Sequence, residues 1–213
     1  RAGDLGMGSR RYAGKRGRPG SSMTVKSLEL PAYDPRGAYG MALAYAVATR
    51  GGCHLRAYPI SHEILRKPVA TDRLSFAGKA RIIKTAEDAN AAMDSIGACR
   101  FSLFGATLEE FADALSAVSG IERSAQDLLD LGERVTFRDR IMNSLRGFTS
   151  DDDDLPARFF EEPGTPGPWP SLPPIPREGF LDARERYYRI RGLAPDGSPL
   201  PGKAEALGLP AGV

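Results

Sequence analysis

The stretch from Tyr39 to Thr49 limits the possible folds of this chain most, because small and apolar residues fill it and no charged residue interrupts it. Alanine is the best helix former, and its short side chain lets a neighbouring element come close. The stretch therefore predicts a tightly packed helix that ends at Gly51-Gly52, since glycine is common where helices stop. Its apolar run, Met41 to Ala48, is far too short to cross a bilayer, which takes about 20 residues.

Helical spacing of apolar residues recurs further along the chain, and Thr107 with Glu110 forms a capping box that starts a helix before Gly120. The other predicted helices and helical turns are Ser61–Arg66, Lys79–Met93, Leu108–Val118, Ser124–Arg146, Leu181–Arg191 and Pro201–Leu209. The inward faces expected for the two helices after Thr107 consist of Leu108, Phe111, Ala112, Leu115 and Val118, and of Leu128, Leu131, Val135, Ile141, Met142 and Leu145.

Strand is expected only as one short extended segment, Met23–Leu30, followed by the turn Asp34-Pro35-Arg36-Gly37, where proline and glycine favour turn conformations. The predicted fold class is mainly α, with several irregularly arranged helices, long loops and little strand.

The chain divides by composition into three parts. Residues 1–22 are basic and rich in Gly, Arg and Ser without periodicity, which predicts a flexible loop and the truncated remainder of a longer chain. Residues 23–150 hold most of the helical patterns, and residues 151–213 carry a proline-rich connector and a final helix packing on the same unit. The acidic run Asp151–Asp154 lacks the alternating ligands of a calcium loop and predicts a solvated loop.

Overall charge narrows the class of partner. Lys and Arg total 29 and Asp and Glu total 27, a net charge of +2, so no global field favours nucleic acid or membranes. Two cysteines do not make a disulfide framework, and no signal-peptide pattern is visible. We therefore expect a cytoplasmic protein with neither a nucleic-acid nor a membrane partner.

Cys99 is a candidate ligand because of its neighbours. Asp94 ends a predicted helix, Gly97 permits close approach of a ligand to the backbone, and Cys99 follows within the same loop. A carboxylate accepts paired hydrogen bonds from planar donors such as a guanidinium or a pterin edge, and a thiolate binds zinc or iron–sulfur clusters. The alternative is that Cys99 is a small buried apolar residue.

The segment Arg50 to His54 has two interpretations. It could simply cap the preceding helix, with Arg50 complementing the helix dipole. It could also form a clamp in which Arg50 and Arg56 hold phosphate while His54 moves a proton near a reacting centre. His62 is expected at the surface.

Six motifs follow one another between about Met23 and Leu209: Pro31-Ala32-Tyr33-Asp34-Pro35-Arg36-Gly37, Arg50-Gly51-Gly52-Cys53-His54, Asp94-x-x-Gly97-x-Cys99, Leu131-Gly132-Glu133-Arg134, Leu155-Pro156-x-Arg158-Phe159 and Tyr187-Tyr188-x-x-Arg191-Gly192. In this order they resemble the C-terminal part of the aldehyde:ferredoxin oxidoreductase family.

The resemblance implies a tungsten enzyme, with molybdenum in some relatives, whose metal is held by two pterins beside a [4Fe-4S] cluster. It implies that Asp94 binds one pterin, that Cys99 is a cluster ligand, and that Ala98 contributes a backbone contact. Arg50 matches a cofactor-binding arginine, and Arg56 stands where the family has lysine, which replaces a point charge by a planar fork. His54 matches the histidine proposed to move a proton during aldehyde oxidation.

The chain also departs from the family. The sequence lacks three features of the family: the amino-terminal β domain, the Cys-x-x-Cys-x-x-x-Cys ligands and the Asp-x-x-Gly-x-Asp motif. We therefore expect a fragment, or a subunit completed by a partner, that is inactive alone and works with a small aldehyde and with ferredoxin or another electron-transfer protein. Two alternatives are a same-family enzyme with another reaction, such as aromatic thioester reduction, and a cofactor-free helical interaction module.

Overall fold

The computed structural model describes residues 2–165 and 171–210, and most of its regular structure is helical. The α-helices are α1 Ala2–Leu5, α2 Ser9–Lys15, α3 Tyr39–Val47, α4 Ile60–Glu63, α5 Lys79–Ser95, α6 Leu108–Ser119, α7 Ala125–Leu145, α8 Arg158–Glu161, α9 Arg177–Arg191 and α10 Pro201–Ala206. Short 3₁₀ turns are η1 Pro19–Ser21, η2 Pro35–Gly37 and η3 Arg100–Phe104, and the strands are β1 Thr24–Val25 and β2 Leu28–Glu29. The prediction of a mainly α fold with little strand is confirmed.

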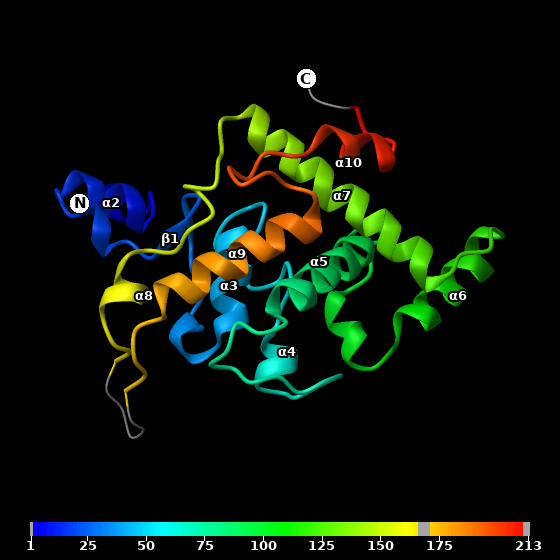
Figure 1. Cartoon of the computed structure of the whole chain (residues 1–213), viewed down its shortest axis with the longest axis horizontal. Helices are drawn as coiled ribbons and strands as arrows, with labels where there is room; N and C mark the ends of the chain where they lie inside the picture. The colour runs from blue at the N-terminus through cyan, green and yellow to red at the C-terminus, as the bar shows by residue number, and fades with distance from the viewer. Residues whose placement is uncertain (1, 166–170, 211–213) are drawn as a thin grey trace.

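Helix α3 lies at the centre of the molecule, and every one of its residues is buried. Helix α9 packs on both α3 and α5, as Figure 1 shows, and contributes Phe180 and Tyr187 to the same apolar core as Met41 and Tyr45 of α3. A helix that is apolar all round requires cover on every side, and the alanines of α3 let that cover come close.

Helices α5 and α7 form the closest helix pair (Figure 1). The contact depends on Gly132 of α7, where an added Cβ atom would lie 1.8 Å from the carbonyl oxygen of Asp88 in α5. Helix α6 packs on the other end of α7 around a smaller apolar cluster that contains Ala112 and Leu128.

Capping residues in the local sequence determine where helices α6 and α7 begin. Thr107 and Ser124 each form a capping box, with Glu110 and Asp127 as the reciprocal partners, and Gly120 ends α6 at φ +70°. Helix α9 begins at Arg177, four residues before the predicted Leu181, because Pro176 is its N-cap residue and the first turn accommodates Gly179.

Two predictions for the first thirty residues are wrong. Residues 1–22 were predicted as loop, but α1, α2 and η1 form there, and the start of α2 is held by Glu29, whose Oε1 accepts from the Ser9 amide at 2.8 Å. The single extended segment Met23–Leu30 is instead a tight hairpin, in which β1 and β2 pair across Lys26 and Ser27. Both turn residues have positive φ, as a two-residue hairpin turn requires.

The acidic run is not the solvated loop that its sequence predicts. Asp153 is fully buried, and Asp154 is paired with Arg177 at 2.5 Å. The expectation fails because three cationic side chains from distant parts of the chain converge on these two carboxylates.

Three residues predicted to face inward are exposed: Val118, Met142 and Leu145. The buried residues of α7 are Leu128, as the sequence predicts, and also Gly132, Thr136, Phe137 and Arg140, which it does not. Part of the proline-rich connector, residues 166–170, lies outside the described residues, and Ile175 at its end is buried. No helix within residues 2–165 or 171–210 is long and apolar enough to span a membrane.

Candidate functional site

The segment that follows α3 is positioned by two glycines. Gly51 has φ +97°, and a Cβ atom added there would lie 2.4 Å from the carbonyl oxygen of Val25 in the hairpin. A Cβ atom on Gly52 would lie 2.6 Å from the side chain of Leu30. The chain therefore passes directly against the hairpin, and this close passage delivers Cys53 and His54 just beyond the helix, as the sequence predicts.

Cys53 is buried and holds Arg50 in place. Its sulfur accepts hydrogen bonds from Arg50 Nε at 3.1 Å and Nη2 at 2.9 Å, and from the Leu55 amide at 3.4 Å. Arg50 is exposed, and its two hydrogen bonds to this sulfur fix the direction of its planar guanidinium.

His54 lies half-buried among aromatic rings. Its ring centroid is 5.6 Å from that of Tyr33 and 6.2 Å from that of Tyr58. Partial burial, together with the positive charges of Arg50 and Arg100, lowers the pKa of His54 below its ordinary value. The imidazole is therefore neutral at physiological pH and able to accept a proton.

The spacing Asp94-x-x-Gly97 follows from the way α5 ends. Gly97 has φ +72°, its amide donates to Asp94 O at 3.3 Å, and the Ala98 amide donates to Met93 O at 3.0 Å. These two bonds make a Schellman motif, which needs a left-handed residue at the position that Gly97 occupies. Since the Ala98 amide is used in this way, only its carbonyl is left for the backbone contact expected of that residue.

Asp94 sits at this helix end with two arginines. Arg100 Nη2 lies 2.6 Å and 2.5 Å from its two carboxylate oxygens, and Arg56 Nη1 lies 3.4 Å from Oδ2. Asp94 keeps 43% of its side chain exposed, so it remains open to a ligand.

Arg56 connects this carboxylate to α7. Its Nη2 lies 3.6 Å from Asp139 Oδ2, and the same oxygen accepts from Thr49 Oγ1 at 3.1 Å. Arg56 Nε and Arg100 Nη1 are buried donors with no partner among the described residues. Because an unsatisfied buried donor is costly, this pair of arginines suits a ligand that brings acceptors.

The predicted phosphate clamp of Arg50 with Arg56 is not preformed. Arg50 bonds to Cys53, whereas Arg56 bonds to Asp94 and Asp139. The residue that sequence reasoning missed is Arg100, which pairs with Asp94 and also acts on His54. Its position directly after Cys99 was the one available signal.

Cys99 is exposed and free, at the N-cap of η3. This exposure excludes the alternative of a buried apolar cysteine. Within the described residues no group of three or more His, Cys, Asp or Glu side chains could hold a metal ion. A cluster bound by Cys99 would therefore need its other ligands from outside the described residues.

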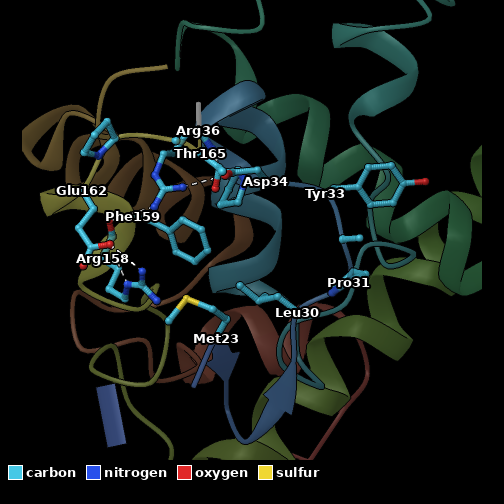
Figure 2. A pocket seen from close by; sticks show the side chains of 14 residues that line it. Met23, Leu30, Pro31, Tyr33, Asp34, Arg36, Arg158, Phe159, Glu162 and Thr165 are labelled. Atoms are coloured by element: carbon cyan, nitrogen blue, oxygen red, sulfur yellow. Dashed lines mark hydrogen bonds and ion pairs between the residues drawn. The ribbon is translucent and has the colours of Figure 1, made fainter. Parts of the chain in front are cut away.

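Two of the family-like motifs meet at a separate cavity of about 620 Å³, shown in Figure 2. Arg36 Nη1 pairs with Asp34 at 2.7 Å, Arg36 Nη2 donates to the carbonyl of Arg158 at 3.2 Å, and the guanidinium lies over the ring of Phe159. These contacts tie the segment around η2 to α8. In Figure 2 Tyr33 points away from this cluster, and its ring contacts His54.

The geometry thus defines a partly exposed site at the ends of α3 and α5, which consists of the His54 imidazole, the Asp94 carboxylate, the exposed thiol of Cys99 and three arginines. Comparison with known sequences gives the same family that the sequence motifs of this site resemble. The sequence model of the family described as "Aldehyde ferredoxin oxidoreductase, domains 2 & 3" matches residues 2–209. The chain belongs to this family.

Curated relatives that match this chain carry the name "Tungsten-containing aldehyde ferredoxin oxidoreductase". Those of Thermococcus kodakarensis and Pyrococcus furiosus are each 40% identical over 211 residues, covering 96% of this chain and 34% of the relative. That of Pyrococcus horikoshii is 38% identical over 193 residues. The chain thus spans about one third of the length of the relatives it matches.

Among solved structures, the fold resembles the active-site complex BamBC of benzoyl coenzyme A reductase in complex with 1,5-dienoyl-CoA. The TM-score is 0.52 at 19% identity, over 67% of this chain and 21% of that one. At this identity the likeness concerns the fold alone.

Proposed function

We propose that this chain forms the C-terminal part of a tungsten-pterin, [4Fe-4S]-dependent oxidoreductase that converts aldehydes to carboxylic acids and passes the electrons to ferredoxin. Family membership supports the class of enzyme. The observation that carries the proposal is the pairing of Asp94 with Arg100 and Arg56 beside the exposed thiol of Cys99 and the neutral imidazole of His54.

The residues present fit the two cofactors. Asp94 is a half-exposed acceptor for the donor edge of a pterin, and the unpartnered Nε of Arg56 provides a donor for its acceptors. Cys99 offers one exposed thiolate for the cluster, and Arg50 offers an exposed, fixed cation. When bound, the tungstopterin would supply a two-electron redox centre and the cluster an electron exit.

The chain's own contribution to the reaction is positioning and proton transfer. Oxidation of an aldehyde with water yields the acid, two electrons and two protons, so a proton acceptor is required. His54 is neutral near pH 7 and can take one of these protons at its free imidazole nitrogen. The rings of Tyr33 and Tyr58, which also contact each other, lie against the His54 ring and keep part of it out of water.

The share of its relatives' length that this chain covers bears on where the remaining cofactor ligands would come from. Since the curated relatives are about three times as long, the other cluster ligands and the second pterin-binding motif would come from a further segment or a partner subunit, and this chain alone would be inactive. Reduction of an aromatic thioester stays an alternative, and an assay of both reactions separates the two.

The test is metal analysis of the protein purified from its native host, with the polypeptide mass measured on the same sample. We expect tungsten with about four irons on a longer polypeptide or complex. Cys99→Ser should lower the iron content, whereas Cys53→Ser, which changes a buried thiol bonded to Arg50, should leave it unchanged. A metal-free protein of this length, or equal iron in both variants, would refute the proposal and favour a cofactor-free module.

A further inference from the structure

A second cavity, of about 670 Å³, opens between α4, the middle of α5, η3 and the start of α6. Its walls are mostly apolar, with the rings of Tyr58, Phe101 and Phe104 next to Leu103, Leu108 and several alanines. A cavity of this size with apolar walls and few polar groups has the character of a small-molecule site.

The three rings form a continuous wall. Tyr58 makes edge contacts with Phe101 and Phe104, each at 6.0 Å between centroids, and the two phenylalanines stack at 5.8 Å and 15°. Phe101 and Phe104 remain 50% and 55% exposed. A planar apolar ligand lying against this wall would remove that surface from water and gain aromatic contacts.

The backbone of Tyr58 indicates that the wall is held at a conformational cost. Tyr58 has φ +48°, a left-handed conformation that is rare for a bulky side chain and that clusters at functional sites. Its hydroxyl is 3.4 Å from that of Tyr33, and its ring is 6.2 Å from His54. Tyr58 thus joins the cavity to the candidate proton acceptor.

The charged side chains that line the cavity are both cationic. They are Arg100 and Lys67, and no Asp or Glu occurs among the lining residues that the structure describes. Nη2 of Arg100 donates to Asp94, whereas its Nη1 is buried and has no partner among the described residues. An unpaired guanidinium nitrogen beside an apolar cavity favours a ligand with a carboxylate.

We propose that this cavity binds monocarboxylates with an aromatic or other bulky apolar group, with the ring against Phe101 and Phe104 and the carboxylate at Arg100 and Lys67. The inference rests on the proposed function for the origin of such a ligand, because an apolar acid is the product of oxidising an apolar aldehyde.

The test is calorimetric titration of the complete polypeptide that carries this chain, with benzoate and with benzyl alcohol, which has the same ring and no charge. We expect benzoate to bind at least about tenfold more tightly. Phe104→Ala should weaken both ligands by about tenfold, and Arg100→Gln and Lys67→Gln should each reduce the preference for benzoate. The matched controls Val118→Ala and Arg189→Gln change exposed residues away from the cavity and should bind like wild type.

Absence of saturable benzoate binding, equal affinity for the two ligands, or wild-type binding in all three cavity variants would overturn the inference. The assay needs no metal, so its outcome is separate from that of the proposed function. Benzoate binding by a protein that oxidises no aldehyde would refute the proposed function but not the proposed carboxylate site. Aldehyde oxidation without benzoate binding would refute the carboxylate site but not the proposed function.

Discussion

Lys26 in the β1–β2 turn places its ammonium 2.5 Å from Asp153 Oδ1, and the two side chains are 3% and 0% exposed. The other carboxylate oxygen of Asp153 accepts from Arg140 Nη1 at 2.6 Å and from the Tyr188 hydroxyl at 2.8 Å. Lys26 also donates to Ala46 O at 2.6 Å. One buried carboxylate thereby connects the hairpin, α7 and α9, and Lys26 extends the connection to α3.

Asp153→Asn keeps the shape of this side chain but removes its charge. Lys26 and Arg140 would then be buried cations without a counter-charge, so we expect the free energy of unfolding to fall by about 3–5 kcal/mol. Chemical denaturation measures this loss. Asp151→Asn, at an exposed position of the same acidic run, should change stability by less than about 0.5 kcal/mol, and equal effects of the two changes would show that the buried pairs contribute nothing.

The same carboxylate predicts how stability depends on pH. Burial opposes ionisation of Asp153, but the charges of Arg140 and Lys26 outweigh it and hold its pKa below the ordinary value. A depressed native pKa gives stability that is present above the unfolded pKa of about 3.9 and is lost as pH falls through the native pKa. The stabilities of wild type and Asp153→Asn, measured between pH 7 and pH 3, should therefore converge only at the acid end. A constant difference over that range would contradict the assignment.

Gly132 provides the closest approach between α5 and α7. Gly132→Ala would gain about 1 kcal/mol of helix propensity, but its Cβ atom would lie 1.8 Å from the carbonyl of Asp88 unless the helices move apart. We expect a net loss of roughly 2 kcal/mol or more in the free energy of unfolding. Gly202→Ala in α10, where an added Cβ meets nothing within 4 Å, should be neutral or slightly stabilising. Equal responses would place the close contact in doubt.

Local features of the sequence predicted much of the fold. The capping boxes at Thr107 and Ser124 and the glycine stop at Gly120 act within one helical turn, so their partners are a few residues away. The Asp94-x-x-Gly97 spacing is likewise local, because a Schellman motif fixes it. The position of Cys99 just after α5 follows from the same turn.

Features set by distant residues were not predictable in this way. The burial of Asp153 depends on Lys26, Arg140 and Tyr188, which lie in three other elements. Met142 and Leu145 are exposed because the helix face that meets α5 is the one with Gly132, and periodicity of apolar residues does not register close backbone contact. For the site, the sequence supplied His54 and Asp94 but not the positions of Arg100 and Tyr58 around them.

The charge of Arg50 should be measurable at His54. Burial together with Arg50 and Arg100 lowers the pKa of His54, so Arg50→Gln should raise that pKa toward its ordinary value. NMR titration of the imidazole resonances reports the change directly. Arg189→Gln, which removes an exposed charge on a different element, α9, should leave the titration unaltered. An unshifted pKa in Arg50→Gln would mean that Arg50 does not act on His54.

The role of His54 in turnover is the most direct test of the proposed chemistry. His54→Asn keeps a polar planar group but removes the basic nitrogen that accepts a proton near pH 7. Since general acid–base groups contribute about 10²–10⁴-fold, we expect aldehyde oxidation to fall within that range while tungsten and iron content stay at wild-type levels. Asp151→Asn serves as the control, with unchanged turnover and metal content. Wild-type turnover in His54→Asn would exclude proton transfer by this residue, and a loss of metal would assign His54 to cofactor retention instead.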